Sequence, residues 1–288
     1  MRNKLGQPAC APLKTVRMAS KYLYKEEHGD GDPILCLHGL GANIFTWRYL
    51  IDPLSRHNKL ILVDLKGSGK SAKPEDGHYS FHDHADAVYE LILKNDWRRL
   101  TLIGNSYGGG LALLLAMRLE ENDPSRLSKL VLIDAGAHKE YLPGYVKLMR
   151  TLLGTLMIFL LPARRTVKFV LDISCFDKGK ISEEQVAAYA VPLGDPGARN
   201  ALLQTVRHCI PSDADELVTK FKSLSVPTLI LWGRHDKVIP LKVGELLSQA
   251  IPNSVLEVFE ECGHIPQEEQ PQKTIARISE FLGISSPR

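Results

Sequence analysis

Apolar residues recur along this chain in short continuous runs. A run of this kind is typical of a parallel strand that is buried on both faces. The runs lie at residues 33–37, 60–63, 100–103, 129–134, 227–232 and 255–259, and a segment of alternating character at 15–27 predicts a strand pair before them. Helix-like segments separate most of the runs. We therefore predict an α/β fold with a mostly parallel, twisted sheet of about eight strands flanked by helices.

The alternation of strands and helices breaks between residues 134 and 227. Helix-like segments at 145–161, 164–173, 182–190 and 197–209, punctuated by prolines, fill this gap, and no segment in it has a convincing strand pattern. Loops longer than about 15 residues usually carry function. We interpret residues 137–212 as a helical cap inserted after the sixth strand, between core segments 1–136 and 213–288.

The composition is that of an ordinary globular protein. The 288 residues are 44% hydrophobic, with a net charge of +3 and no basic block, so nucleic acid is not indicated as a partner. Five widely spaced cysteines without a C-x-x-C pair favour reduced thiols, and hence a cytoplasmic protein, over a disulfide framework or a zinc site. The N-terminal segment lacks the apolar core of a signal peptide. The apolar run at 152–161 is, at about ten residues, too short to span a bilayer. The oligomeric state is open, and a homodimer is compatible with the sequence.

Residues 100–117 (LTLIGNSYGGGLALLLAM) predict a strand, a sharp turn and a helix. The turn has the spacing G-x-S-x-G, with Gly104 and Gly108 on either side of Ser106. Glycines at these positions let the neighbouring backbone pass close to a strained turn. Such a turn lifts the serine hydroxyl above the sheet edge and aims a helix N-terminus at whatever binds there. Ser106 is therefore the candidate nucleophile.

A serine hydroxyl becomes an effective nucleophile when a base takes its proton and a carboxylate orients that base. Asp236 follows the predicted strand at 227–232, and His264 follows the last strand. Both are expected at the carboxyl edge of the sheet, where Ser106 also lies. The chain order Ser106, Asp236, His264 is the one expected for this turn. Asp134 also ends a strand at this edge and remains an alternative for the acid.

Together these segments resemble the α/β-hydrolase fold superfamily, in the capped group that includes esterases, C–C hydrolases of meta-cleavage products, epoxide hydrolases and haloalkane dehalogenases. The matching motifs cover nearly the whole chain outside the insertion. They are residues 38–41 (HGLG), 64–71 (DLKGSGKS), 104–108 (GNSYG), 233–240 (GRHDKVIP) and 263–266 (GHIP) with Glu269.

The resemblance implies that Ser106 is the nucleophile, His264 the base and Asp236 the orienting acid. It also implies an oxyanion hole formed by the backbone N–H groups of Leu40 and Tyr107. These roles predict hydrolysis of a carboxylic ester through an acyl-enzyme, with neither a metal nor an organic cofactor. A serine at the turn disfavours the epoxide hydrolase and dehalogenase activities, because those relatives use an aspartate there.

Two alternatives to an esterase stay open. One is a C–C hydrolase of vinylogous 1,5-diketones with the same triad, although the lack of an aromatic residue after His264 favours the ester. The other is a non-catalytic receptor that keeps the pocket. We expect a small to medium apolar ester or a related carbonyl compound as substrate. The aliphatic side chains of 152–160 either contact it or pack the cap onto the core. The candidate substrate contacts are Gly39, Gly41, Leu153, Met157, Phe159 and Val238.

Two further patterns are weaker. Residues 67–71 (GSGKS) suggest a phosphate-binding loop, but G-x-x-x-x-G-K-S requires glycine at the position of Asp64. His78, His82 and His84 do not provide the combination of an i, i+4 pair within one helix and a carboxylate that is typical of a zinc site, so we predict surface histidines.

Three residues close to the candidate triad or oxyanion turn are given structural roles. His235 is predicted to be a solvated loop residue rather than the base. His38 is predicted to pack beneath the oxyanion turn, and Cys262 to be structural, since the serine already serves as nucleophile.

Overall fold

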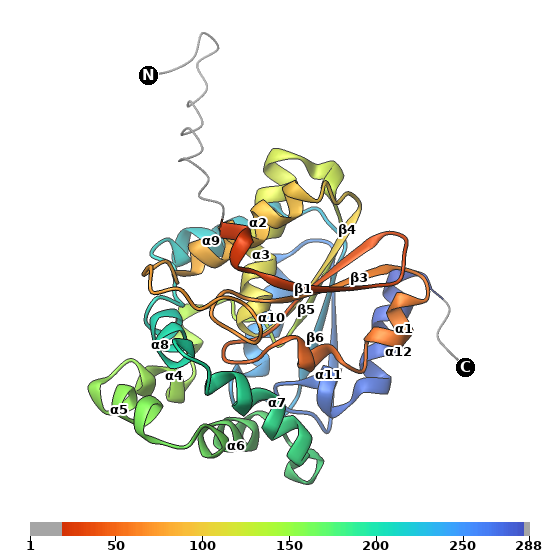
Figure 1. Ribbon diagram of the computed structural model, residues 1–288. Coiled ribbons are helices and arrows are strands. Elements are labelled where there is room, and N and C mark those ends of the chain that lie inside the picture. Colours follow the sequence, from red (N-terminus) through yellow and green to blue (C-terminus); the bar gives the residue numbers. More distant parts are fainter. Residues whose placement is uncertain (1–18, 285–288) are drawn as a thin grey trace.

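Seven strands form one twisted sheet in the computed structural model, which describes residues 19–284 (Figure 1). Their order is β1-β3-β2-β4-β5-β6-β7. β1 pairs antiparallel with β3, and every other neighbouring pair is parallel. The strands are β1 (Tyr24–His28), β2 (Pro33–Leu37), β3 (Lys59–Asp64), β4 (Leu100–Asn105), β5 (Leu127–Ile133), β6 (Thr228–Gly233) and β7 (Ser254–Phe259). The mostly parallel sheet predicted from the apolar runs is confirmed.

The strand pair predicted at 15–27 is only partly a strand. Residues 15–18 lie outside the described part of the chain, and Ala19–Tyr22 forms a short 3-10 helix. Glu90 of α2 (Phe81–Lys94) fixes this turn, because its carboxylate accepts hydrogen bonds from the N–H groups of Ala19 and Ser20 at 2.8 and 3.2 Å. The described chain therefore has seven strands rather than eight, and the helical insertion follows the fifth of them.

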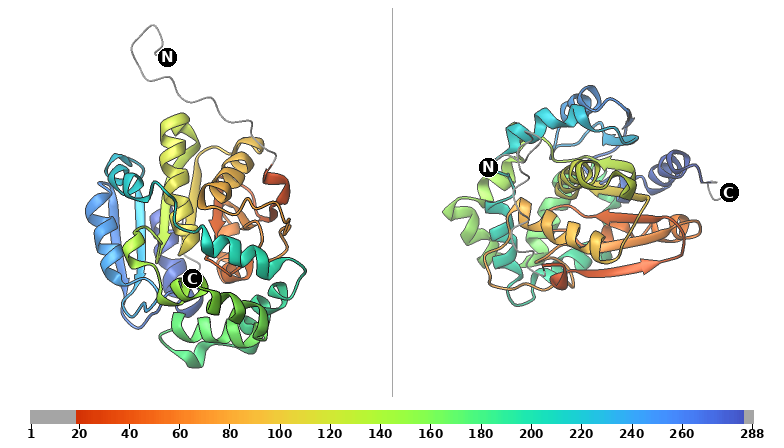
Figure 2. Two further views of the ribbon diagram at one scale, coloured as in Figure 1. Left: turned by 90° about the vertical axis from the view of Figure 1, so that its left-hand side faces the viewer. Right: turned by 90° about the horizontal axis from the view of Figure 1, so that it is seen from above.

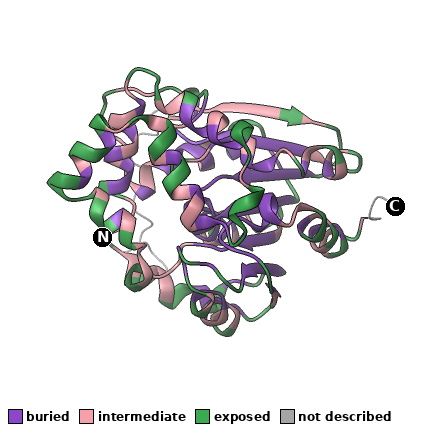
Figure 3. Cartoon of the chain, turned by 90° about the horizontal axis from the view of Figure 1, so that it is seen from below, coloured by how far each residue is buried: buried purple, intermediate pink, exposed green. Residues whose placement is uncertain are grey.

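Side chains of the central strands alternate between two apolar layers. In β2, Leu35 and Leu37 pack with α2, α3 (Tyr107–Asn122) and α10 (Leu241–Ala250). Ile34 and Cys36 belong to the opposite layer, which includes side chains of α1 (Ile51–Ser55) and α12 (Pro271–Leu282). Figure 3 shows the buried strands and the exposed outer turns of the surrounding helices. Because both faces are covered, these strands are apolar throughout.

Six α-helices lie between β5 and β6, and the structure describes this whole segment. They are α4 (Gly144–Met149), α5 (Leu152–Leu160), α6 (Ala163–Ser174), α7 (Glu183–Leu193), α8 (Ala198–Arg207) and α9 (Ala214–Lys220). Most of them gather at one end of the molecule (Figure 2). The helix predicted at 145–161 is two helices, because the Thr151 hydroxyl caps α5 by accepting a hydrogen bond from the Gly154 N–H at 3.1 Å.

The remaining elements are short. They are α11 (Pro266–Glu269) and 3-10 helices at Ala19–Tyr22, Ile44–Trp47, Pro124–Arg126, Lys139–Tyr141, Lys178–Lys180 and Phe221–Ser223. Among residues 19–284, no helix combines the length and the apolar character needed to cross a bilayer.

Candidate active site

Ser106 lies at the sharp turn between β4 and α3. Its backbone angles, φ 55° and ψ −118°, are rarely adopted by L-residues and cost about 1–3 kcal/mol. Two hydrogen bonds hold the turn. The Ser106 N–H donates to the Ile133 carbonyl at 3.0 Å, and the Gly136 N–H donates to the Ser106 carbonyl at 2.8 Å. The strained turn is therefore fixed by the end of β5 and the loop that follows it.

Close backbone approach explains both glycines of the turn. A Cβ on Gly104 would lie 2.3 Å from the Gly108 carbonyl oxygen, and a Cβ on Gly108 would lie 2.1 Å from that of Leu37. Neither glycine has a positive φ. Gly104 and Gly108 are therefore needed because a side chain would not fit at these positions, and not for their backbone angles. The G-x-S-x-G spacing follows from the packing of α3 against β2 and β4.

Asp236 and His264 form a buried pair. The His264 Nδ1 and the Asp236 Oδ2 are 2.7 Å apart. The other oxygen, Asp236 Oδ1, accepts hydrogen bonds from the N–H groups of Val238 and Ile239 at 2.7 and 3.0 Å. One carboxylate oxygen is thus fixed by backbone while the other orients the imidazole. With Nδ1 donating to Asp236, Nε2 is the nitrogen that can accept a proton.

The backbone of His264 is held from two sides. Its N–H donates to the Ser174 carbonyl, at the end of α6, at 2.6 Å. Its carbonyl accepts a hydrogen bond from Asn105 Nδ2 at 3.2 Å, and the same nitrogen donates to the Ile133 carbonyl at 3.1 Å. The buried amide of Asn105 therefore links the Ser106 turn, β5 and the His264 loop. The sequence analysis gave Asn105 no such role.

Asp134 lies beside this pair without being the partner of the histidine. Its Oδ1 accepts a hydrogen bond from the Gly233 N–H at 3.0 Å, and its Oδ2 has no hydrogen-bond partner within the described chain. Complete burial, followed by the nearby Asp236 carboxylate, holds the pKa of Asp134 well above its ordinary value. The geometry favours Asp236 over Asp134 as the acid that orients His264.

Asp134, Asp236 and His264 form a cluster of potential metal ligands. One carboxylate oxygen of each aspartate and one ring nitrogen of His264 lie within 4.8 Å of one another. The Asp236 oxygens are already used by His264 and by two backbone N–H groups. The hydrogen bonds of the pair account for this cluster without a metal.

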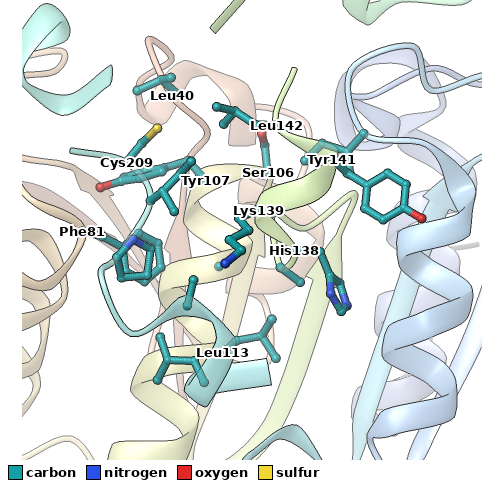
Figure 4. Close-up of a pocket in the computed structure, with 18 of the residues that line it drawn as sticks. Leu40, Phe81, Ser106, Tyr107, Leu113, His138, Lys139, Tyr141, Leu142 and Cys209 are labelled. Carbon is teal, nitrogen blue, oxygen red and sulfur yellow. The ribbon is translucent and has the colours of Figure 1, made fainter. Parts of the chain in front are cut away.

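Two apolar cavities meet at Ser106. The first has a volume of about 120 Å³, and its wall includes Phe81, Leu113, Leu114, Met117, Leu142 and Leu217 (Figure 4). The second has a volume of about 100 Å³, and its wall includes Val167, Val170, Leu171, Leu193 and Leu202. Leu40, Ser106 and Tyr145 line both cavities, whereas His264 lines only the second. Ser106 is thus accessible from two apolar compartments, one of which also contains the imidazole.

The candidate oxyanion residues lie at this junction. Leu40 lines both cavities, and Tyr107, the first residue of α3, lines the first. In the described chain neither backbone N–H donates to another backbone group. The N–H groups of a helix N-terminus lack intrahelical partners and favour negative charge. The position of Tyr107 is therefore compatible with the predicted role.

The predicted substrate contacts divide into two groups. Gly39 and Gly41 line the second cavity, and a Cβ on Gly39 would lie 3.2 Å from the Cβ of Ser106. The other four do not line either cavity. Val238 is buried within the loop that carries Asp236, and three side chains of α5 are exposed. The exposed three are Leu153, Met157 and Phe159. The helix α5 directs these side chains to solvent, which corrects the expectation that they contact substrate.

His84 corrects the prediction of a surface histidine. It is buried, its ring packs edge-on against Tyr107 with centroids 5.7 Å apart, and its Nε2 lies 3.3 Å from Thr205 Oγ1. Burial lowers the pKa of His84 to about 3. His78 and His82 are partly exposed as expected, with His82 Nε2 2.8 Å from Asp213 Oδ1. These histidines form no metal cluster among the described residues.

The other three structural predictions agree with the structure. His235 is exposed and stacks on Phe176, with ring centroids 4.5 Å apart. His38 is fully buried, and its Nε2 accepts a hydrogen bond from the Leu65 N–H at 3.0 Å. Cys262 is fully buried, and burial raises the pKa of its thiol, so it is a packed and unreactive side chain.

The turn at residues 67–71 (GSGKS) surrounds the carboxylate of Asp64, at the place where a phosphate-binding loop would hold a phosphate. Asp64 accepts hydrogen bonds from the N–H groups of Ile44 and Lys70 at 2.8 and 2.7 Å. A Cβ on Gly69 would lie 2.1 Å from an Asp64 oxygen. The carboxylate therefore fills this turn, in agreement with the sequence argument against a phosphate-binding loop.

Glu268 forms a buried polar network that the sequence analysis missed. Its carboxylate accepts hydrogen bonds from Thr46 Oγ1 (2.8 Å), Arg48 Nη1 (2.5 Å), Gln185 Nε2 (3.0 Å) and the Tyr189 hydroxyl (2.5 Å). Gln185 and Tyr189 belong to α7, whereas Glu268 lies in α11, just after His264. Glu268 thus joins the insertion to the segment that carries the histidine, at the wall of the second cavity.

Comparison with known proteins gives a consistent result. A family model described as "Alpha/beta hydrolase family" matches residues 34–278. The chain is 30% identical to the 2-hydroxy-6-oxo-2,4-heptadienoate hydrolase of Pseudomonas putida, over 88% of this chain and 90% of that protein. Among solved structures it is similar to a meta-cleavage product hydrolase from Pseudomonas fluorescens IP01 (25% identity, TM-score 0.76, 91% and 94% of the two chains). It is also similar to an esterase from Exiguobacterium antarcticum (26% identity, TM-score 0.76, 91% and 95%).

Proposed function

The chain belongs to the alpha/beta hydrolase family, and from this premise we propose that it hydrolyses carboxylic esters of small to medium apolar substrates through an acyl-enzyme on Ser106. One observation carries the proposal: Ser106 and the imidazole of the buried Asp236–His264 pair line the same apolar cavity. A nucleophile, a base and an orienting carboxylate at one apolar site are the parts that acyl transfer needs.

In the proposed reaction, His264 Nε2 takes the proton of Ser106 as the hydroxyl oxygen attacks the substrate carbonyl carbon. The backbone N–H groups of Leu40 and Tyr107 stabilise the oxyanion that forms, and loss of one such donor typically costs about 10²-fold or more in rate. The tetrahedral intermediate expels the alcohol, which receives its proton from His264. Water, deprotonated by His264, then releases the acid and regenerates Ser106.

The two cavities suggest where each half of the ester binds. The leaving alcohol must take a proton from His264, and His264 lines the second cavity but not the first. We therefore assign the alcohol to the second cavity and the acyl chain to the first. In this proposal, residues 137–212 act as the cap over Ser106. They supply Leu142 and Val146 to the first cavity and Val170 to the second.

The charges around the cavities favour a neutral substrate. Among the residues that line them, Lys139 is the one Lys or Arg side chain, and its ammonium group pairs with Asp215. Glu268, at the second cavity, is a carboxylate whose hydrogen bonds come from the protein itself. An anionic substrate group would find no unpaired cation there, and would lie close to a carboxylate.

The second candidate is hydrolysis of a C–C bond in a vinylogous 1,5-diketone by the same residues. It is favoured by the likeness to the Pseudomonas putida hydrolase, whose name gives a heptadienoate, a carboxylate, as its substrate. The lack of an unpaired cation at the cavities makes the ester the better proposal.

Labelling with a fluorophosphonate probe tests the proposal directly. We expect a single adduct on Ser106 by mass spectrometry, and none in Ser106→Ala. An unlabelled serine in a folded protein would instead support the non-catalytic receptor. Rates with p-nitrophenyl esters and with 2-hydroxy-6-oxo-2,4-heptadienoate would then separate the two reactions. Faster turnover of the dienoate would overturn the ester assignment.

A further inference from the structure

The helix α5 is apolar on surfaces that face solvent. Leu152 and Leu160 are 78% and 76% exposed, and Leu153, Leu156, Met157 and Phe159 are also exposed. Only Gly154 and Ile158 of this helix are buried. A folded protein rarely leaves so many large apolar side chains together in water unless the surface binds something. Figure 1 shows α5 at the edge of the molecule, away from the sheet.

The protein holds α5 in place without burying these side chains. Gly154 packs so closely on α4 that a Cβ would lie 2.0 Å from the Leu148 carbonyl oxygen. At the other end, Arg199 Nη1 of α8 donates hydrogen bonds to the carbonyls of Phe159 and Leu161 at 2.9 and 3.0 Å. The helix is therefore anchored by its backbone, and its outer side chains are not needed for that attachment.

Basic side chains flank α5 in the sequence on both sides. Residues 141–171 contain five basic side chains and no Asp or Glu, although the chain as a whole has 33 acidic residues in 288. The five are Lys147 and Arg150 before α5, and Arg164, Arg165 and Lys168 after it, all of them exposed. Arg164 pairs with Glu183 and Lys168 with Asp172, whereas the other three form no ion pair among the described residues. Apolar side chains flanked on both sides by cations match an anionic lipid surface, with acyl chains below the headgroups.

We propose that α5 and its five flanking basic residues form a docking surface for an anionic phospholipid bilayer. The apolar side chains enter the interface and the cations contact the headgroups; the helix does not span the membrane. A second copy of this chain fits less well, because a two-fold contact through α5 would bring the same cations of both copies together.

Docking at α5 would have a consequence for access to the cavities. The helices on either side of α5 line them: Val146 and Met149 come from α4, and Val167 and Val170 from α6. The bilayer would therefore lie against the cap side of the molecule, where apolar esters dissolved in lipid are concentrated. The docking surface itself does not depend on the proposed reaction, since binding is measured without turnover.

Vesicle co-sedimentation of the full chain tests the proposal. We expect vesicles of phosphatidylcholine and phosphatidylglycerol (about 3:1) to bind at least about tenfold more tightly than phosphatidylcholine alone. Raising the salt from about 20 to about 200 mM should weaken that binding. The variant Leu152→Glu/Leu160→Glu should lose at least about tenfold in affinity. Arg150→Gln/Arg165→Gln should lose the preference for the anionic vesicles while keeping its fold, because both side chains are exposed.

Val255→Glu is the matched control, because Val255 is an exposed apolar residue (56%) on β7, outside this surface. It should bind as the parent protein does. Three results would overturn the proposal. The first is that the parent protein does not bind anionic vesicles, and the second is that Leu152→Glu/Leu160→Glu binds them as well as the parent does. The third is that the parent protein is a dimer in sedimentation analysis whereas Leu152→Glu/Leu160→Glu is a monomer. The last result would assign the surface to a second copy.

Discussion

The carboxyl groups of Asp134 and Asp236 share one buried environment, with an oxygen of each within 4.8 Å of the other and of a His264 nitrogen. Asp236 receives hydrogen bonds from two N–H groups and pairs with the imidazole, whereas Asp134 receives one hydrogen bond. Burial, and then the Asp236 carboxylate beside it, raise the pKa of Asp134, because two carboxylates this close do not both ionise readily.

Replacing Asp134 with asparagine should stabilise the protein increasingly as the pH rises. A pKa raised by folding means that the stability contributed by this group is complete below about pH 4, its unfolded pKa, and is lost as the pH rises toward the folded pKa. The asparagine side chain does not titrate. The unfolding free energy of Asp134→Asn, relative to that of the parent protein, should therefore increase by up to about 1.4 kcal/mol per pH unit in this window. Urea unfolding of both proteins at several pH values measures it. Asp30→Asn, at an exposed loop position, is the matched control. A difference between Asp134→Asn and the parent that does not change with pH would contradict the raised pKa of Asp134.

The same two aspartates should differ in their effect on turnover. Asp236→Asn removes the carboxylate that sets the imidazole tautomer, and such a change typically lowers kcat by about 10⁴. Asp134→Asn preserves a neutral group of the same shape and should retain activity within about tenfold. Ester hydrolysis by both variants, with circular dichroism to verify folding, makes the comparison. A larger loss in Asp134→Asn than in Asp236→Asn would make Asp134 the acid.

Glu268→Ala should destabilise the protein by about 3–5 kcal/mol, because it removes one partner of a buried ion pair and leaves Arg48 and Tyr189 without their acceptor. Chemical unfolding measures the loss. Glu261→Ala, at an exposed position of the preceding loop, should stay within about 0.5 kcal/mol of the parent. Equal stabilities of the two variants would show that the network does not hold the insertion.

Leu217→Trp should shorten the acyl chain that the enzyme accepts, since Leu217 lines the first cavity. We expect kcat/KM for p-nitrophenyl octanoate to fall by about tenfold or more relative to the acetate. Val170→Trp narrows the second cavity, so it should slow both esters by a similar factor and leave their ratio unchanged. If Val170→Trp alone changed the ratio, the two cavities would have the opposite roles.

Local patterns were enough to predict the strands and the turn at Ser106. The apolar run before Ser106 is a buried strand in the structure, and the two turn glycines are explained by short contacts with β2 and with one another. These features depend on residues close in sequence or on the general rule that parallel strands are covered on both faces. The order of motifs also predicted Asp236 and His264, whose contact the structure shows. The cytoplasmic location and the homodimer stay predictions.

The sequence by itself therefore determined the mostly parallel sheet, the turn at Ser106, and Ser106 and His264 as the candidate nucleophile and base. Tertiary structure alone decided which of two aspartates contacts His264, that His84 is buried, and that the apolar side chains of α5 face outward. The physical reason is distance along the chain. Glu268 meets Thr46 across 222 positions, and Asn105 meets His264 across 159. No local periodicity encodes such contacts, because they form only when separate elements pack together.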